Sequence, residues 1–86
     1  MAALAAGVLD TKVKELIAMA IGVVHGCDGC IAAHAGGAAR AGATKQEAAE
    51  AIGVSILMHS GPATIYGARA YTAFCKFADT AIAHSA

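Results

Sequence analysis

The stretch ELIAMAIGVVHGCDGCIAAHAGGAARAGATKQEAAE, residues 15–50, contains three runs of helix-forming residues separated by two breaks that contain glycine. The first run continues a pattern in which apolar residues recur at intervals of three and four. These residues are Val13, Leu16, Ile17, Ala20, Ile21 and Val24. Because Asp10 and Thr11 before them are both good N-caps, the pattern predicts a helix over residues 11–24.

The residues after this helix predict a second one. Gly26 can end the first helix, and Asp28 stands where the second helix would begin. The second helix is expected to continue over residues 31–40 and to stop at Gly42. The two cysteines of CDGC, residues 27–30, therefore lie at a helix N-terminus.

Two further helices follow. Thr44 precedes Glu47 by three residues, which is the capping-box pattern, and it predicts the start of a third helix. The stripe of this helix comprises Ala48, Ile52, Ile56 and His59. Gly61 and Pro62 should break it, and residues 63–83 are predicted to form a long fourth helix.

Glycine makes a helix less stable than alanine does, so the glycines inside the predicted helices need a structural explanation. A close approach of another helix would explain Gly36 and Gly37 in the second helix. Gly67 is expected to be the weak point of the fourth helix. No strand signal competes with the helices, so the expected fold class is all-α.

The composition limits how much apolar surface one chain can bury. With 86 residues, the chain is expected to form a single domain, residues 1–86, and a domain this small hides only about 60% of the surface of its unfolded chain. Yet 58% of its residues are hydrophobic and only 14% are charged, against about 45–50% and 25% on average. In the last predicted helix the large apolar residues are spread around the circumference, as in a helix buried on several sides. They are Ile65, Tyr66, Tyr71, Phe74, Cys75, Phe77 and Ile82. We therefore expect a homo-oligomer.

The charges argue against two classes of partner. Six Lys and Arg residues balance six Asp and Glu residues, with no basic block for nucleic acid or for anionic lipid. The longest uncharged run contains the helix-breaking sequence HSGP, residues 59–62, so no membrane-spanning helix is expected. The opening MAALAAGVLD lacks the basic region of a signal peptide, which favours a reducing cytoplasmic location.

The chemistry concentrates around the two cysteines. Cys27 and Cys30 are close enough in a first helical turn to form a disulfide, and the free amides there favour a thiolate. His34 projects from the same face as Cys30 one turn later, so it could exchange a proton with that thiol. Glu15 is the acidic residue within the apolar stretch of the first helix, and a carboxylate drawn inside there could act as a base.

Simpler interpretations exist for each of these residues. A CxxC spacing also occurs in zinc sites, but four ligands from one short loop, His25 to His34, would be unusual for structural zinc. The cysteines could also be inert packing residues. Glu15 could share a solvated edge with Lys12 and Lys14, and His34 could be an ordinary hydrogen-bonded core histidine.

Four of these residues also carry a resemblance. Glu15, Cys27, Cys30 and His34 follow the order Glu, eleven residues, Cys-x-x-Cys, three residues, His. This pattern resembles the AhpD-like alkylhydroperoxidase branch of the carboxymuconolactone decarboxylase family. The GAT turn, residues 42–44, and the following Glu47 match as well, so the resemblance covers roughly half of the chain.

The resemblance implies an all-helical protein that assembles as trimers or hexamers and acts as a thiol peroxidase or disulfide reductase. By this likeness Cys30 attacks a hydroperoxide, Cys27 resolves it to a disulfide, and Glu15 with His34 relays protons. An external dithiol would then reduce the pair, and no bound cofactor or metal is required. The chain departs from many peroxidase members at Gly29, where they carry a second histidine. His25 is the nearest substitute, and a slower or different thiol reaction stays open.

Two rival functions remain at this stage. One is a metal-binding or redox-sensing module without turnover, and the other is a decarboxylase or lactone-processing enzyme of the wider family, whose chemistry has no use for a CxxC pair. The other candidate residues are given structural roles. Cys75 is expected to be a small buried hydrophobe, His59 a helix-end residue and His84 part of a frayed tail.

Overall fold

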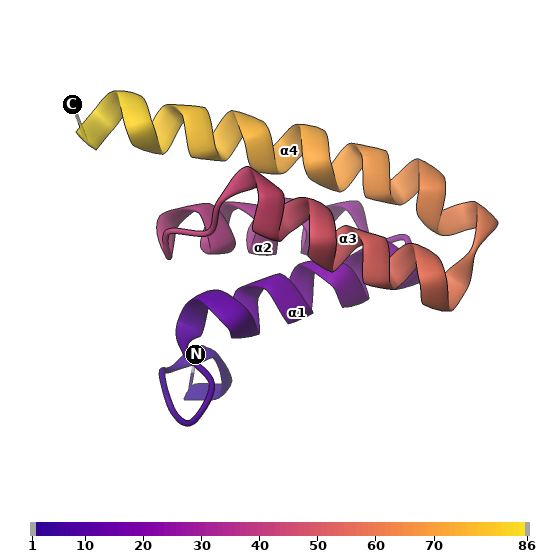
Figure 1. Ribbon diagram of the computed structural model, residues 1–86, viewed down its shortest axis with the longest axis horizontal. Coiled ribbons are helices and arrows are strands. Elements are labelled where there is room, and N and C mark those ends of the chain that lie inside the picture. The colour runs from indigo at the N-terminus through magenta and orange to yellow at the C-terminus, as the bar shows by residue number, and fades with distance from the viewer. Residues whose placement is uncertain (1, 86) are drawn as a thin grey trace.

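The computed structural model describes the backbone of residues 2–85 and the side chains of residues 2–80. A short 3-10 helix, η1 (Ala2–Leu4), precedes four α-helices in this range: α1 (Thr11–His25), α2 (Asp28–Arg40), α3 (Lys45–His59) and α4 (Gly61–Ser85) (Figure 1). The described residues form no strand, which confirms the all-α prediction. The side chains of Ile82 and His84, for which the sequence made predictions, lie outside the described residues.

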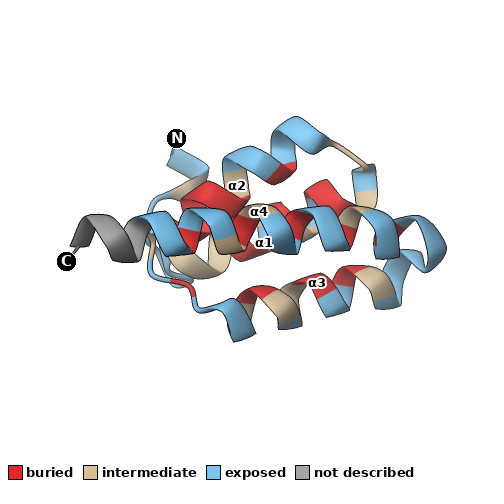
Figure 2. Ribbon diagram, turned by 90° about the horizontal axis from the view of Figure 1, so that it is seen from above, coloured by how far each residue is buried: buried red, intermediate tan, exposed pale blue. Residues whose placement is uncertain are grey.

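The four helices pack as a bundle. α1 and α4 lie opposite each other, and α2 and α3 fill the two sides between them (Figure 1, Figure 2). Consecutive helices run in opposite directions because the turns between them are short. No helix among the described residues is long and apolar enough to cross a bilayer.

Local capping interactions set the first helix boundaries. The side chain of Asp10 accepts a hydrogen bond from the backbone N–H of Val13 at 2.8 Å, which caps the start of α1. Gly26 ends α1 in the left-handed conformation, with φ of 63°, where glycine has no Cβ to clash. The backbone N–H of Cys27 then bonds the carbonyl of Gly22 at 3.0 Å, and α2 begins at the next residue. Both predicted helices and the break at Gly26 are confirmed.

The third helix begins with the predicted capping box. The Thr44 hydroxyl accepts from the Glu47 backbone N–H at 3.0 Å, and the Glu47 carboxylate accepts from the Thr44 backbone N–H at 2.8 Å. Lys12 of α1 lies 2.9 Å from the same carboxylate and holds the pKa of Glu47 below its usual range. The capping box therefore also ties the start of α3 to α1.

The break between α3 and α4 differs by one or two residues from the prediction. The chain turns at Ser60, whose φ of 58° is unusual for a residue other than glycine. Gly61 and Pro62 are the first residues of α4 and do not precede it. Proline is well suited to a first helical turn, because its missing N–H would have no intrahelical partner there.

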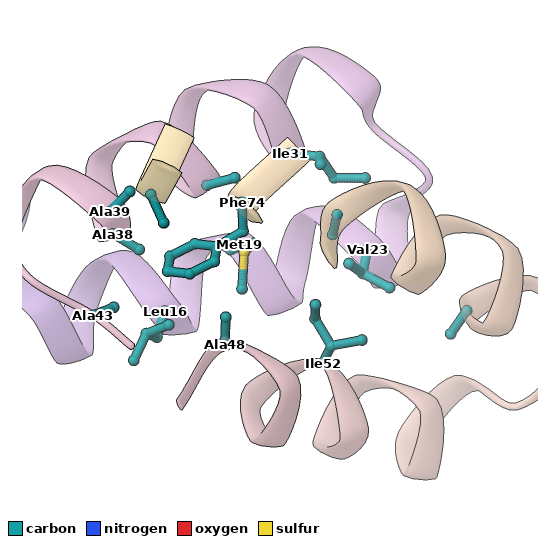
Figure 3. Close-up of a cluster of buried hydrophobic side chains, with 14 residues drawn as sticks. Leu16, Met19, Val23, Ile31, Ala38, Ala39, Ala43, Ala48, Ile52 and Phe74 are labelled. Atoms are coloured by element: carbon teal, nitrogen blue, oxygen red, sulfur yellow. The ribbon is translucent and has the colours of Figure 1, made fainter. Parts of the chain in front are cut away.

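The core forms where small residues let the helices approach. The side chains of Phe74 on α4 and Met19 on α1 are fully buried, and alanines of α2 and α3 surround them (Figure 3). On α4 the buried residues make one stripe of Ala63, Gly67, Ala70, Phe74 and Ala78. A Cβ at Gly67 would lie 2.9 Å from the Cγ2 atom of Ile52, so this glycine is a site of close contact between α4 and α3, and the helix continues through it.

The large apolar residues of α4 are not buried on several sides within one chain. Ile65, Tyr71 and Phe77 remain exposed, and the outward side of α4 is pale blue in Figure 2. Cys75 is half-buried, which corrects the expectation that it would be a buried hydrophobe. Apart from Phe74, alanine and glycine occupy the inward stripe instead, because they let α4 lie close to its neighbours.

Helix α1 has two apolar faces. Most residues of the apolar stripe from which the sequence predicts this helix do not lie on the face that packs in the core. The core face carries Leu16, Met19 and Val23. Ile17 and Ile21 of the sequence stripe are 45% and 51% exposed. They line an open groove of about 360 Å³ together with Val13, Val24, Val54 and Met58, between α1 and α3.

The capping box makes a prediction about stability. Thr44→Ala removes the hydroxyl that accepts the Glu47 N–H, so the free energy of unfolding should fall by about 1 kcal/mol in urea denaturation. Thr72→Ala is a matched control, because Thr72 is exposed within α4 and caps no helix. The control should be neutral or slightly stabilising, since alanine favours helix more than threonine does. Equal losses in both variants would contradict the role of the cap.

Candidate functional site

The two cysteines of the CxxC sequence form a disulfide at the start of α2. Their Cα atoms are 5.2 Å apart, and Cys75 remains a free cysteine. Cys27 is the N-cap of α2, so its sulfur accepts a hydrogen bond from the backbone N–H of Cys30 at 3.1 Å. An amide donor and the positive end of a helix both favour a thiolate over a thiol. The position therefore suits a cysteine pair that cycles between disulfide and dithiol.

The two sulfur-bearing residues differ in their surroundings. Cys30 is exposed, whereas Cys27 is half-buried behind the end of α1. The hydrogen bond from the amide reaches the sulfur of Cys27. An approaching reagent therefore meets Cys30 first, while Cys27 holds the better-stabilised sulfur.

Glu15 and His34 form the second pair of the site. The Nδ1 atom of His34 lies 2.7 Å from the Oε1 atom of Glu15, although the residues are 19 apart in the chain. Glu15 is only 8% exposed, and the side chain of His34 is 28% exposed. When the Glu15 carboxylate is ionised it can only accept hydrogen bonds, so Nδ1 of His34 would then be the donor and Nε2 would be left to exchange a proton.

The burial of Glu15 rules out a solvated polar edge. The two lysines that could have formed such an edge bind elsewhere: Lys12 pairs with Glu47 at 2.9 Å, and Lys14 donates to the carbonyl of Ala5 at 2.7 Å. Glu15 instead faces α2, where His34 is its hydrogen-bond partner. A buried carboxylate needs such a partner, because leaving it unpaired away from water is costly.

The close approach of α1 and α2 brings the two pairs onto one hairpin. A Cβ at Gly22 of α1 would lie 3.3 Å from the Cβ of Cys30, so the helices nearly touch beneath the disulfide. Further along, Glu15 lies against Gly37 of α2. The structure joins Cys27 to Cys30 and Glu15 to His34, and it records no hydrogen bond between the two pairs within the residues that it describes.

Three further residues lie near the disulfide. Arg69 of α4 donates to the carboxylate of Asp28, which lies between the cysteines, at 3.1 Å. The Arg69 guanidinium also lies 5.0 Å from the centre of the Tyr66 ring. That ring packs over Gly26, where an added Cβ would be 3.2 Å from it. Asp28 and Arg69 are 41 residues apart, so no local pattern could have paired them.

The remaining candidate residues lie apart from these pairs. His25 is exposed at the last residue of α1, and His59 is exposed at the last residue of α3. Within the described part of the chain, no three His, Cys, Asp or Glu side chains are grouped as metal ligands would be. Cys75 lies beside Tyr71, and hydrogen bonding with the Cys75 side chain raises the pKa of Tyr71.

Comparisons with known proteins point to one family. The sequence profile of the carboxymuconolactone decarboxylase family matches residues 1–76. The chain is 41% identical over 68 residues to an uncharacterized protein of Cupriavidus necator, a match that covers 79% of this chain and 60% of that protein. It is 42% identical over 64 residues to uncharacterized protein 4 in the cox locus of Paracoccus denitrificans, covering 74% of this chain and 58% of the relative.

A solved structure has the same fold. The crystal structure of the apo form of a carboxymuconolactone decarboxylase family protein from Legionella pneumophila superposes with a TM-score of 0.86 and 43% sequence identity. The match covers 90% of this chain and 69% of that protein. By the coverages given above for the Cupriavidus and Paracoccus proteins, the chain spans about 60% of the length of these two curated relatives.

Proposed function

Because the chain belongs to the carboxymuconolactone decarboxylase family, we propose that it is a thiol-dependent peroxidase or disulfide oxidoreductase of the AhpD-like kind. The observation that carries the proposal is the disulfide between Cys27 and Cys30 at the start of α2, on the same helix hairpin as the buried pair of Glu15 and His34. These two features provide a reversible two-electron centre and a means to move protons. A decarboxylase would have no use for the cysteine pair.

The proposed peroxide step uses the exposed sulfur. The thiolate of Cys30 attacks one oxygen of a hydroperoxide, the O–O bond breaks, and the alkoxide takes a proton and leaves as an alcohol. Cys30 becomes a sulfenic acid. His34 supplies the proton from Nε2, because Nδ1 is held by Glu15, and Glu15 stabilises the imidazolium before the proton is given up.

The second step closes the disulfide. The thiolate of Cys27, stabilised by the backbone N–H of Cys30, attacks the sulfur of the sulfenic acid. The S–O bond breaks, and the hydroxide leaves as water after it takes a proton. Cys27 and Cys30 are then linked as they are in the structure.

An external dithiol completes the cycle. It attacks the disulfide, leaves the protein pair reduced and becomes a disulfide itself, so one hydroperoxide and one dithiol yield one alcohol, one water and one oxidised dithiol. Attack at the exposed Cys30 would release Cys27 as the thiolate that the amide stabilises. Such a cycle fits a reducing compartment such as the cytoplasm, where dithiols are kept reduced.

The test of the cysteine roles is peroxide consumption with a dithiol reductant. Cys30→Ser should abolish consumption, because it removes the attacking sulfur. Cys27→Ser should allow one oxidation per chain and leave a sulfenic acid on Cys30 that dimedone traps, but it should not turn over. Cys75→Ser is the control and should match the wild type, because Cys75 lies outside the disulfide.

Two other outcomes of the same assay would distinguish a peroxidase from the rival functions. Consumption by Cys30→Ser at the wild-type rate would contradict the proposal. If peroxide oxidises the wild-type pair once but added dithiol supports no turnover, the protein is a redox sensor and not a peroxidase.

The proton relay gives a second prediction. Glu15→Gln and His34→Gln should each keep the fold but lose about 10²–10⁴-fold in turnover, the usual contribution of a positioned acid or base. Because both residues serve one step, the double variant should be scarcely slower than the poorer single variant. His59→Gln is the control, since His59 is exposed at the end of α3, outside the α1–α2 hairpin, and should leave the rate unchanged. Wild-type rates in both single variants from pH 6 to 8 would show that the pair is structural.

We also propose that the protein is a homo-oligomer, a trimer or a hexamer. The support is the exposed apolar surface on three helices: Ile17 and Ile21 on α1, Leu57 and Met58 on α3, and Ile65 on α4. Leu57 and Met58 are 78% and 75% exposed, which is a large exposure for apolar side chains next to one another. Sedimentation velocity at micromolar concentration should show three or six copies, and a single monomeric species would contradict the proposal.

A further inference from the structure

Gly37 of α2 is buried directly against the carboxyl group of Glu15. A Cβ added to Gly37 would overlap the Oε2 atom and the carboxyl carbon of Glu15, and it would lie 3.0 Å from Oε1. Real Cβ atoms do not approach other atoms so closely. The carboxyl group of Glu15 therefore occupies the space that any other residue at position 37 would fill.

The neighbouring glycine has different surroundings. A Cβ at Gly36 would lie 3.1 Å from the Nη1 atom of Arg40 and 3.3 Å from the ring of Phe77. Both belong to exposed side chains, whose ends have room to move by a few tenths of an ångström. Gly36 and Gly37 are thus adjacent helical glycines of which only one adjoins the site.

Glu15 has little freedom to yield to a side chain at position 37. The residue is 8% exposed, it lies between two helices, and its Oε1 atom is held 2.7 Å from Nδ1 of His34. A Cβ at Gly37 would require the carboxylate to rotate or α2 to shift, because the interior is close-packed. Either movement changes the distance between Glu15 and His34.

We propose that Gly37 is a positioning residue that keeps the carboxylate of Glu15 against His34. It touches neither sulfur, and it acts through Glu15 by leaving open the space for the carboxyl group. The geometric part of this inference stands by itself, and only its effect on turnover rests on the proposed function. The sequence singled out two glycines in α2, Gly36 and Gly37. The proposal gives a role in the site to Gly37 alone.

The experiment compares Gly37→Ala with Gly36→Ala. Both replace a buried helical glycine by alanine, so they gain the same intrinsic helix propensity and differ in what the new methyl group meets. Long-range proton–nitrogen NMR spectra of the imidazoles report which nitrogen of His34 carries the proton. The wild type and Gly36→Ala should show a proton held on Nδ1 by Glu15, and Gly37→Ala should lose that signature.

Turnover should follow the NMR signature. Gly37→Ala should slow peroxide consumption to about the level of Glu15→Gln, a loss within the 10²–10⁴-fold range of a positioned acid or base, and Gly36→Ala should keep the wild-type rate. If the protein consumes no peroxide at all, the proposed function fails, and the His34 signature alone still decides the role of Gly37.

A second variant covers the case in which Gly37→Ala does not fold. Glu15→Ala removes the carboxyl group that the new methyl would overlap, so Glu15→Ala/Gly37→Ala should be as stable to heat as Glu15→Ala alone. Recovery of stability in the double variant supports the proposal. An equal loss of stability with and without Glu15 would overturn it, as would a Gly37→Ala protein that keeps the wild-type His34 signature.

Discussion

The hydrogen bond between Glu15 and His34 joins α1 to α2 inside the hairpin that carries both parts of the site. A carboxylate that is 8% exposed needs a partner, and the imidazole 2.7 Å away provides one. Glycine makes this possible at both ends of the hairpin, with Gly37 next to Glu15 and Gly22 beneath Cys30. The same close packing that stabilises the hairpin thus places the Glu15–His34 pair and the sulfur pair on it.

The sequence predicted those features that depend on neighbouring residues. Asp10, Gly26 and the capping box of Thr44 with Glu47 act within one helical turn, so the boundaries that they set were read correctly. The sequence pattern places the start of α4 two residues too late, because Pro62 can either end one helix or occupy the first turn of the next. Local chemistry allows both positions, and only the turn at Ser60 decides between them.

Interactions between distant residues could not be read from the sequence in the same way. The spacing of α1 showed an apolar stripe but could not show that Met19 and Val23 would enter the core while Ile17 and Ile21 stayed outside. The contact of Asp28 with Arg69 spans 41 residues and has no local signal. Only the resemblance to a family groups Glu15 with His34. The two residues are 19 apart and lie on different helices, so helical spacing alone cannot show that their side chains meet.

The absence of a second histidine at Gly29 is not explained by packing. A Cβ at this position would meet no atom within 4 Å, so α2 has open space there for a larger side chain. The resemblance to peroxidase members implies a second histidine beside the sulfurs, whereas this chain has open space at that place. In the proposed cycle the proton carrier is the buried pair of Glu15 and His34, because His25, although it stands two residues before Cys27, is exposed at the last residue of α1. In the proposed cycle, proton transfer would therefore depend on how accurately Glu15 is held, and Gly37 is the residue that leaves room for it.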